Sequence, residues 1–145
     1  MRIAVGADEQ LDVAQYLLAY FRELGHAVDW YGPSVGESQP WPQVAEQVAR
    51  SVASGAAQMG VALCWTGTGV CIAANKVRGI RAALCVDAET ARGARLWNDA
   101  NVLCLSMRLT SRPVAREIVD AWLAADYLPN PTDDACLALI RKLEE

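Results

Sequence analysis

Short apolar runs alternate with longer segments of helical periodicity along all 145 residues of the chain. The runs have the length of strands and lie at residues 3–5, 27–30, 60–64, 80–86 and 102–106. Between and after them, apolar residues recur at helical spacing in residues 11–24, 42–54, 70–76, 88–96, 113–124 and 135–143. Because residues 60–64 are nearly all apolar, that strand is expected to be covered on both faces, as in parallel sheets.

Strands that alternate with helices predict an α/β fold. We expect a doubly wound, five-stranded parallel sheet in the order 2-1-3-4-5, with helices on both faces in a three-layer sandwich. Residues 1–145 are expected to form a single domain, in which residues 126–145 carry a divergent tail helix. Ligands of such sheets bind beyond the carboxyl ends of the strands, where the strand order reverses. Asp8 follows the first run and Cys64 ends the third, so we expect the two to meet there.

Charge and cysteine content exclude several classes of protein. The net charge is −4 and no basic cluster is present to neutralise phosphates, so nucleic acid is not an expected partner. No apolar run approaches the roughly 18 residues that span a bilayer, and the charged start of the chain does not resemble a signal peptide. Five cysteines without a CxxC pair give neither a disulfide framework nor a zinc site. We therefore expect a cytoplasmic protein without a metal, a cofactor or a membrane partner.

The densest functional motif is the string CWTGTGVCIAANK at residues 64–76. Gly67 and Gly69 would let the backbone approach a ligand closely, and the start of the following helix offers unpaired N–H groups. Such a turn can hold a phosphate or a developing oxyanion. Neither the P-loop spacing GxxxxGK[ST] nor the dinucleotide fingerprint GxGxxG is present. The turn alone therefore predicts an anion site without specifying its chemistry.

With GIRAALCVDAETAR and NDANVL downstream, this string resembles the ribose-5-phosphate isomerase B and galactose-6-phosphate isomerase family. Members of that family commonly read CGTGxGxSIAANK, GIRAAL and HNDANVL in these places. The resemblance covers residues 1–125 and includes Asp8 and the turn Leu24-Gly25-His26. It implies a doubly wound fold and a homodimer, sometimes a tetramer, with a site shared between chains. It also implies that aldose and ketose phosphates of pentoses or related sugars interconvert through an enediolate, without a metal.

The resemblance assigns catalysis to Cys64 and Thr66. Cys64 matches the cysteine that acts as the base, and a thiol beside helix-start amides is expected to ionise readily. Without the resemblance, a cysteine at the end of a buried strand would be interpreted as a small core residue. Thr66, Gly67, Thr68 and Gly69 match the loop whose backbone amides would stabilise the enediolate oxygen.

Further substrate contacts are implied outside this loop. Asp8 matches an acid that contacts sugar hydroxyls, although a helix N-cap is an equally good interpretation of the residue alone. Asn98 matches an amide that contacts the substrate, and Arg108 matches an arginine that contacts the phosphate. Cys71 stands where the family has Ser, and we interpret it as a packing residue.

Four departures from the family pattern point to a modified site. Trp97 replaces the histidine that helps to open the sugar ring, and its indole nitrogen is not basic. Glu9 replaces another common histidine, and Trp65 replaces a glycine. The family's C-terminal GGRHxxR segment reads LPNPTDDACLALIRK here, and its Asp133 and Asp134 would repel a phosphate. We expect Glu9, Trp65 and Trp97 to bind a changed sugar, phosphorylated or not, because indole rings stack on sugar faces.

Two functions are consistent with these observations. The first is a metal-independent aldose–ketose isomerase that uses Cys64 as the base and a sugar phosphate as substrate. The second is a non-catalytic member of the family, either a sugar-binding protein or an inactive subunit of a hetero-oligomer. The loss of histidine at position 97 and of the terminal arginines favours the second function, and the intact motif at residues 64–76 favours the first.

Overall fold

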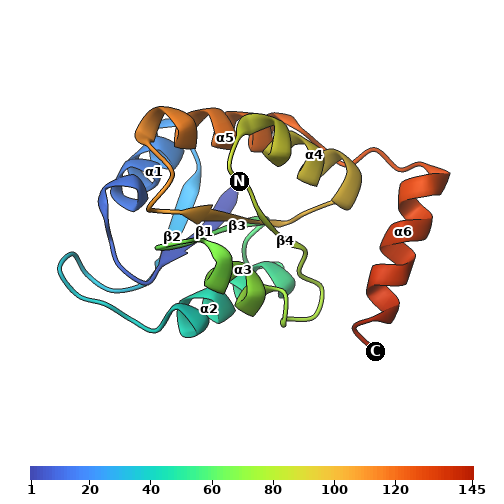
Figure 1. The fold of residues 1–145 in the computed structure, drawn as a ribbon, viewed down its shortest axis with the longest axis horizontal. Coiled ribbons are helices and arrows are strands. Elements are labelled where there is room, and N and C mark those ends of the chain that lie inside the picture. The colour runs from blue at the N-terminus through green and yellow to red at the C-terminus, as the bar shows by residue number, and fades with distance from the viewer.

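A computed structural model of the chain describes all 145 residues as three layers around one parallel sheet (Figure 1). The sheet order is β2-β1-β3-β5-β4, and every neighbouring pair is parallel. Helices α1, α4 and α5 cover one face, and α2 and α3 cover the other (Figure 1). The doubly wound α/β class is therefore confirmed. The elements are β1 (Arg2–Ala7), α1 (Asp12–Glu23), β2 (Ala27–Tyr31), α2 (Trp41–Ala53), β3 (Met59–Cys64), α3 (Thr68–Ala74), β4 (Ala82–Leu84), α4 (Ala88–Asn98), β5 (Val102–Ser106), α5 (Arg112–Ala124) and α6 (Pro131–Lys142).

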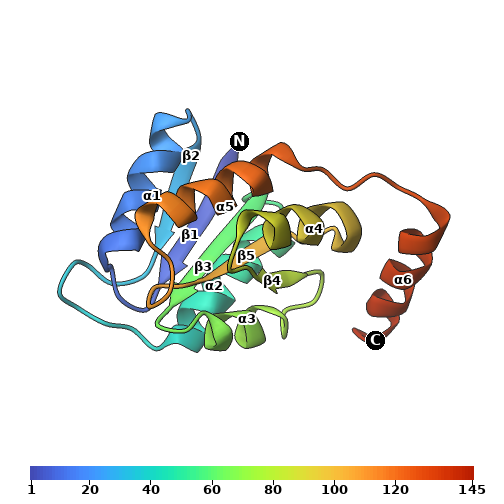
Figure 2. The same ribbon diagram turned by 45° about the horizontal axis from the view of Figure 1, so that its top comes forward.

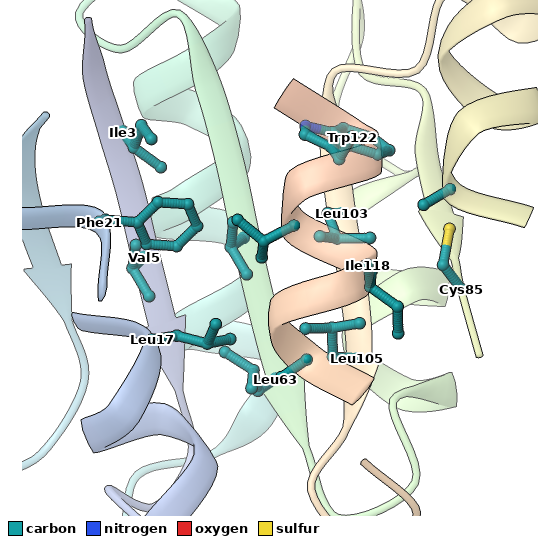
Figure 3. Close-up of a cluster of buried hydrophobic side chains, with 14 of the residues drawn as sticks. Ile3, Val5, Leu17, Phe21, Leu63, Cys85, Leu103, Leu105, Ile118 and Trp122 are labelled. Atoms are coloured by element: carbon teal, nitrogen blue, oxygen red, sulfur yellow. The ribbon is translucent and has the colours of Figure 1, made fainter. Parts of the chain in front are cut away.

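Two apolar clusters fill the space between the sheet and its helices. The larger lies under α1, α4 and α5 and is built from branched and aromatic side chains such as Leu17, Phe21, Leu103 and Trp122 (Figure 3). The smaller lies under α2 and α3. Small residues of the sheet face α2, since a Cβ added to Gly6 would lie 2.7 Å from Val44 Cγ1. Close packing of α2 therefore requires the glycine that the first strand carries.

The last two strands take the reverse of the predicted order, with β5 inside the sheet and β4 at its edge. Every residue of β5 is buried, whereas the three residues of β4 are only half-buried. The edge of β4 is closed by a side chain, because the Asn75 amide donates to Ala82 O and accepts from Ala82 N, both at 2.9 Å. A fully apolar strand gains most from the central position, and a short strand with a polar partner tolerates the edge.

The tail helix α6 stands at one side of the domain after an extended connection (Figures 1 and 2). It begins at Pro131 rather than at the predicted residue 135. The reason is that Asn130 caps the helix by accepting the N–H of Asp133 at 2.9 Å, and proline suits the first turn. Arg95 anchors the connection by donating to Ala125 O at 3.1 Å.

None of the helices combines the length and the apolar character needed to cross a membrane.

Candidate functional site at the carboxyl edge of the sheet

Asp8, Cys64 and Ser106 lie side by side where three neighbouring strands end. Ala7 pairs with Leu63 across β1 and β3, so Asp8 and Cys64 occupy the next positions on the same edge. Cys64 pairs in turn with Ser106 of β5. Adjacent strands are about 4.8 Å apart, so the three residues form one short row. The row therefore contains Asp8 and Cys64, which the predicted topology places together, and also Ser106.

The loop after Cys64 is held in shape by the loop after β5. Met107 N donates to Cys64 O, Arg108 N donates to Trp65 O, and the Ser106 hydroxyl also donates to Trp65 O, each at 2.9 Å. Trp65 is 56% exposed, so its ring lies at the surface of this clamp. Ser106 was not predicted from the sequence; its position next to Cys64 on the sheet edge is the feature that identifies it.

Gly67 and the two threonines define the turn into α3. Gly67 has a φ of +76°, and an added Cβ would lie 2.8 Å from the carbonyl carbon of Leu105. The Thr66 and Thr68 hydroxyls hydrogen-bond to each other at 2.7 Å. The first amides of α3 follow immediately, and amides at a helix start have no carbonyl partner within the helix. The turn can therefore present N–H groups to an anion.

Cys64 itself is only 4% exposed and packs in the smaller apolar cluster with Val70 and Ala45. Three surface cavities of about 550 to 720 Å³ are lined by other residues. In a single subunit, the thiol therefore lies just beneath the surface of the edge.

Asp8 carries a carboxyl oxygen, Oδ1, that is buried without a hydrogen-bond partner. Burial raises the pKa of this carboxyl, and the negative charge of Glu9 raises it further. The N-cap interpretation does not apply, because α1 begins four residues later and its N-cap position is Leu11. A buried acceptor without a donor is costly for the protein alone and is suited to a hydroxyl group of a ligand.

We predict that Asp8→Asn stabilises the fold at pH 7 while impairing substrate binding. The raised native pKa means that the stability linked to Asp8 is fully present below its unfolded pKa, about 3.9, and is lost as the pH rises through the native value. The side-chain amide that replaces the Asp8 carboxyl does not ionise, so the Asp8→Asn variant keeps this stability at pH 7. Its thermal unfolding midpoint should be higher than that of the wild type at pH 7, and the two midpoints should converge near pH 4.

Asp12→Asn is the matched control. The Arg112 guanidinium donates to Asp12 at 2.9 Å and lowers the pKa of that carboxyl. The stability that the ionised Asp12 contributes is therefore present above its unfolded pKa and is lost as the pH falls through the native pKa. The Asp12→Asn variant should accordingly be less stable than the wild type at pH 7. If both variants shift the midpoint in the same direction, burial of Asp8 is not the cause.

Trp41 also lies at this edge, against the turn into α3. It is the first residue of α2 and is 42% exposed. Its ring lies against Gly69, 3.0 Å from the position of an added Cβ. The Pro-Trp-Pro start of α2 places the ring over the turn, and no periodicity in the sequence indicates that contact.

Trp97 and Asn98 lie at the opposite end of the sheet from Cys64. They end α4, just before β5 begins at Val102, which pairs with Gly60. Gly60 precedes Cys64 by four residues, or about 13 Å along a strand. Trp97 folds back over Gly93, and both Trp97 and Asn98 line a cavity of about 710 Å³ beside α6. One subunit therefore does not bring these two predicted contacts to its own Cys64.

Arg108 and Glu9 are exposed near the edge. Arg108 belongs to the loop that hydrogen-bonds to residues 64 and 65, and Glu9 forms an isolated antiparallel bridge with Ser38. No group of three His, Cys, Asp or Glu side chains is placed to hold a metal ion.

The fold and this edge define a doubly wound α/β protein in which a cysteine and a carboxyl group with one unpartnered oxygen adjoin a turn that can present N–H groups to an anion. The chain belongs to the ribose/galactose isomerase family, whose model matches residues 3–135. It is 40% identical over 129 residues to a D-erythrulose-4-phosphate isomerase of Pectobacterium atrosepticum, covering 88% of this chain and 85% of that protein. Ribose-5-phosphate isomerase B of Escherichia coli is 39% identical over 127 residues, with coverage of 87% and 85%. Ribose-5-phosphate isomerase B of Clostridium thermocellum superimposes with a TM-score of 0.95 at 35% identity, covering 99% of this chain and 97% of that one.

Proposed function

We propose that the protein is a metal-independent aldose–ketose isomerase of sugar phosphates. The Cys64 thiolate takes a proton from the carbon beside the substrate carbonyl and returns it to the neighbouring carbon. The amides of residues 66–69 stabilise the enediolate oxygen between these steps. The observation that carries this proposal is that Asp8, with one unpartnered carboxyl oxygen, follows the strand next to the one that Cys64 ends, because Asp8 can accept a hydrogen bond from the substrate hydroxyl that orients the reacting carbons.

The proposed site is shared by two copies of the chain. Cys64 is almost fully buried in one subunit, and Trp97 and Asn98 lie about 13 Å further along the sheet. A twofold dimer can bring the α4 end of one copy over the Cys64 edge of the other, since each copy presents both surfaces. Large apolar side chains exposed in the single subunit support such a contact: Trp41, Trp65, Ile72, Val86 and Trp97.

Subunit complementation tests this arrangement. We expect Cys64→Ala and Asn98→Ala chains each to be inactive as homodimers. If the two chains are co-expressed and assemble at random, half of the dimers are hybrids. Each hybrid has one intact site and one site that carries both substitutions. Activity should then recover to about a quarter of the wild-type value. No recovery in hybrids purified with two different tags would place Asn98 outside a shared site.

The tryptophan at position 97 favours a substrate that needs no ring opening. A tetrose 4-phosphate cannot close a five-membered ring because the O4 that would close it on C1 carries the phosphate, and the corresponding tetrulose has no hydroxyl that could close such a ring on its C2 carbonyl. Ribose 5-phosphate, in contrast, closes through its O4. A relative of this chain is named for D-erythrulose 4-phosphate, which is such a tetrulose phosphate. We therefore expect turnover of tetrose phosphates to exceed that of ribose 5-phosphate, measured as kcat/KM on the purified chain. Absence of turnover with tetrose, pentose and hexose phosphates would favour the non-catalytic alternative.

A further inference from the structure

Ser106 joins the two loops that follow the central strands of the sheet. It is the last residue of β5, pairs with Cys64 and is only 3% exposed. Its hydroxyl donates to Trp65 O at 2.9 Å and accepts the N–H of Leu109 at 3.1 Å. One buried side chain therefore holds both the loop that leads into α3 and the loop that carries Arg108.

The carbonyl of Trp65 is held by two donors. Besides the Ser106 hydroxyl, Arg108 N donates to the same oxygen at 2.9 Å, so both lone pairs of that oxygen are occupied. The chain contains no cis peptide, and in a planar trans peptide the N–H points opposite to the C=O. The two donors on Trp65 O therefore fix the direction of the Thr66 N–H, which points away from the loop after β5.

The Thr66 N–H donates to no backbone carbonyl of the subunit. The Thr66 hydroxyl is already bonded to Thr68 Oγ1 at 2.7 Å. In the proposed reaction, the amides of residues 66–69 stabilise the enediolate oxygen. Such donors are most effective when their direction is fixed before the charge develops. The hydrogen bonds to Trp65 O supply this fixed direction for the first of these amides.

We propose that Ser106 is a positioning residue for the isomerase reaction, whose hydroxyl orients the Thr66 N–H through the Trp65 carbonyl. This role rests on the proposed function. The Ser106 hydroxyl acts at a distance from the reacting atoms, because it is engaged with Trp65 and Leu109. The competing interpretation is a serine that only caps the turn after β5. A cap would lower stability when removed but would leave the kcat of the folded protein unchanged.

Ser106→Ala distinguishes these two roles by kinetics. Arg108 N alone would then hold Trp65 O, so the peptide can tilt while the Thr66 N–H remains present. We expect kcat to fall about 10- to 100-fold, less than the roughly 10²- to 10³-fold cost of losing a whole oxyanion donor. KM should stay close to the wild-type value. Ser106→Thr keeps the hydroxyl and suits a strand, so it should restore most of the lost kcat.

Ser51→Ala is the matched control. Ser51 lies on α2 and is also buried, but its hydroxyl oxygen has no hydrogen-bond partner. Removal of the same atom at this position should leave kcat unchanged. A folded Ser106→Ala protein with wild-type kcat, or a Ser106→Thr protein as slow as Ser106→Ala, would overturn the positioning role.

The direction of the Thr66 N–H can also be measured without a substrate. Residual dipolar couplings of the isotope-labelled protein report the orientation of each backbone N–H relative to the sheet. We expect the Thr66 coupling to change in Ser106→Ala and to keep its wild-type value in Ser106→Thr and Ser51→Ala. An unchanged coupling in Ser106→Ala would overturn the proposal whatever the activity. Absence of turnover by the wild-type protein would instead contradict the isomerase function, and the couplings would still decide whether Ser106 orients this amide.

Discussion

Replacement of Cys64 by alanine should lower kcat by about 10²- to 10⁴-fold, the range that general-base catalysis contributes. In the proposed mechanism, the variant loses the group that moves the proton, while the amides of residues 66–69 and Asp8 remain to bind the substrate. KM should therefore change much less than kcat. The direct measurement is the incorporation of solvent deuterium beside the substrate carbonyl, followed by NMR in parallel with turnover.

Cys104→Ala provides the matched control for this experiment. Cys104 belongs to the same apolar cluster and is completely buried, so both variants remove a packed sulfur. Each should cost on the order of 1 kcal/mol of unfolding free energy. Only Cys64→Ala should lose deuterium exchange when both are assayed under reducing conditions. Wild-type exchange in a folded Cys64→Ala protein would remove Cys64 from the mechanism.

The sequence predicts the class of fold because the strands and the helices each have a characteristic pattern of apolar residues. A strand covered on both sides must be apolar throughout, as residues 60–64 are, and a surface helix must alternate apolar and polar faces. The sequence contains no comparable pattern that indicates the order of β4 and β5 in the sheet. Both are apolar runs, and the contact that closes the outer edge of β4 comes from the Asn75 side chain of another element.

The candidate site is predictable where residues follow strand ends and is not predictable where elements meet in space. Asp8 and Cys64 follow neighbouring strands of a parallel sheet, so topology alone places them together. Trp41 reaches Gly69 only through the packing of α2, which sequence periodicity does not describe. Trp97 stands close to the motif in the sequence, yet a whole helix carries it to the other end of the sheet. Because a helix that connects parallel strands ends at the amino end of the next strand, this separation already follows from the predicted α/β pattern.

Gly67→Ala should be the most damaging single substitution in the turn of residues 66–69, which we propose stabilises the enediolate. The left-handed φ of +76° costs about 1–2 kcal/mol for a residue with a Cβ. The added methyl would also lie 2.8 Å from Leu105 C and 2.9 Å from Ser106 N, which are backbone atoms of a central strand. Overpacking of this kind costs about 1–3 kcal/mol, so we expect the unfolding free energy in urea to fall by about 2–5 kcal/mol. Turnover should be lost even in the folded fraction, because the loop amides move away from the enediolate oxygen.

Gly55→Ala distinguishes the strain of a positive φ from the steric overlap of the added methyl group. Gly55 ends the turn after α2 with a φ of +80°, and no atom lies within 4 Å of an added Cβ. This variant therefore carries the conformational strain without the collision and should lose only about 1–2 kcal/mol with normal turnover. If Gly67→Ala is no less stable than Gly55→Ala, the turn can shift away from β5. If Gly67→Ala also retains wild-type turnover, the amides of this turn do not stabilise the reaction intermediate.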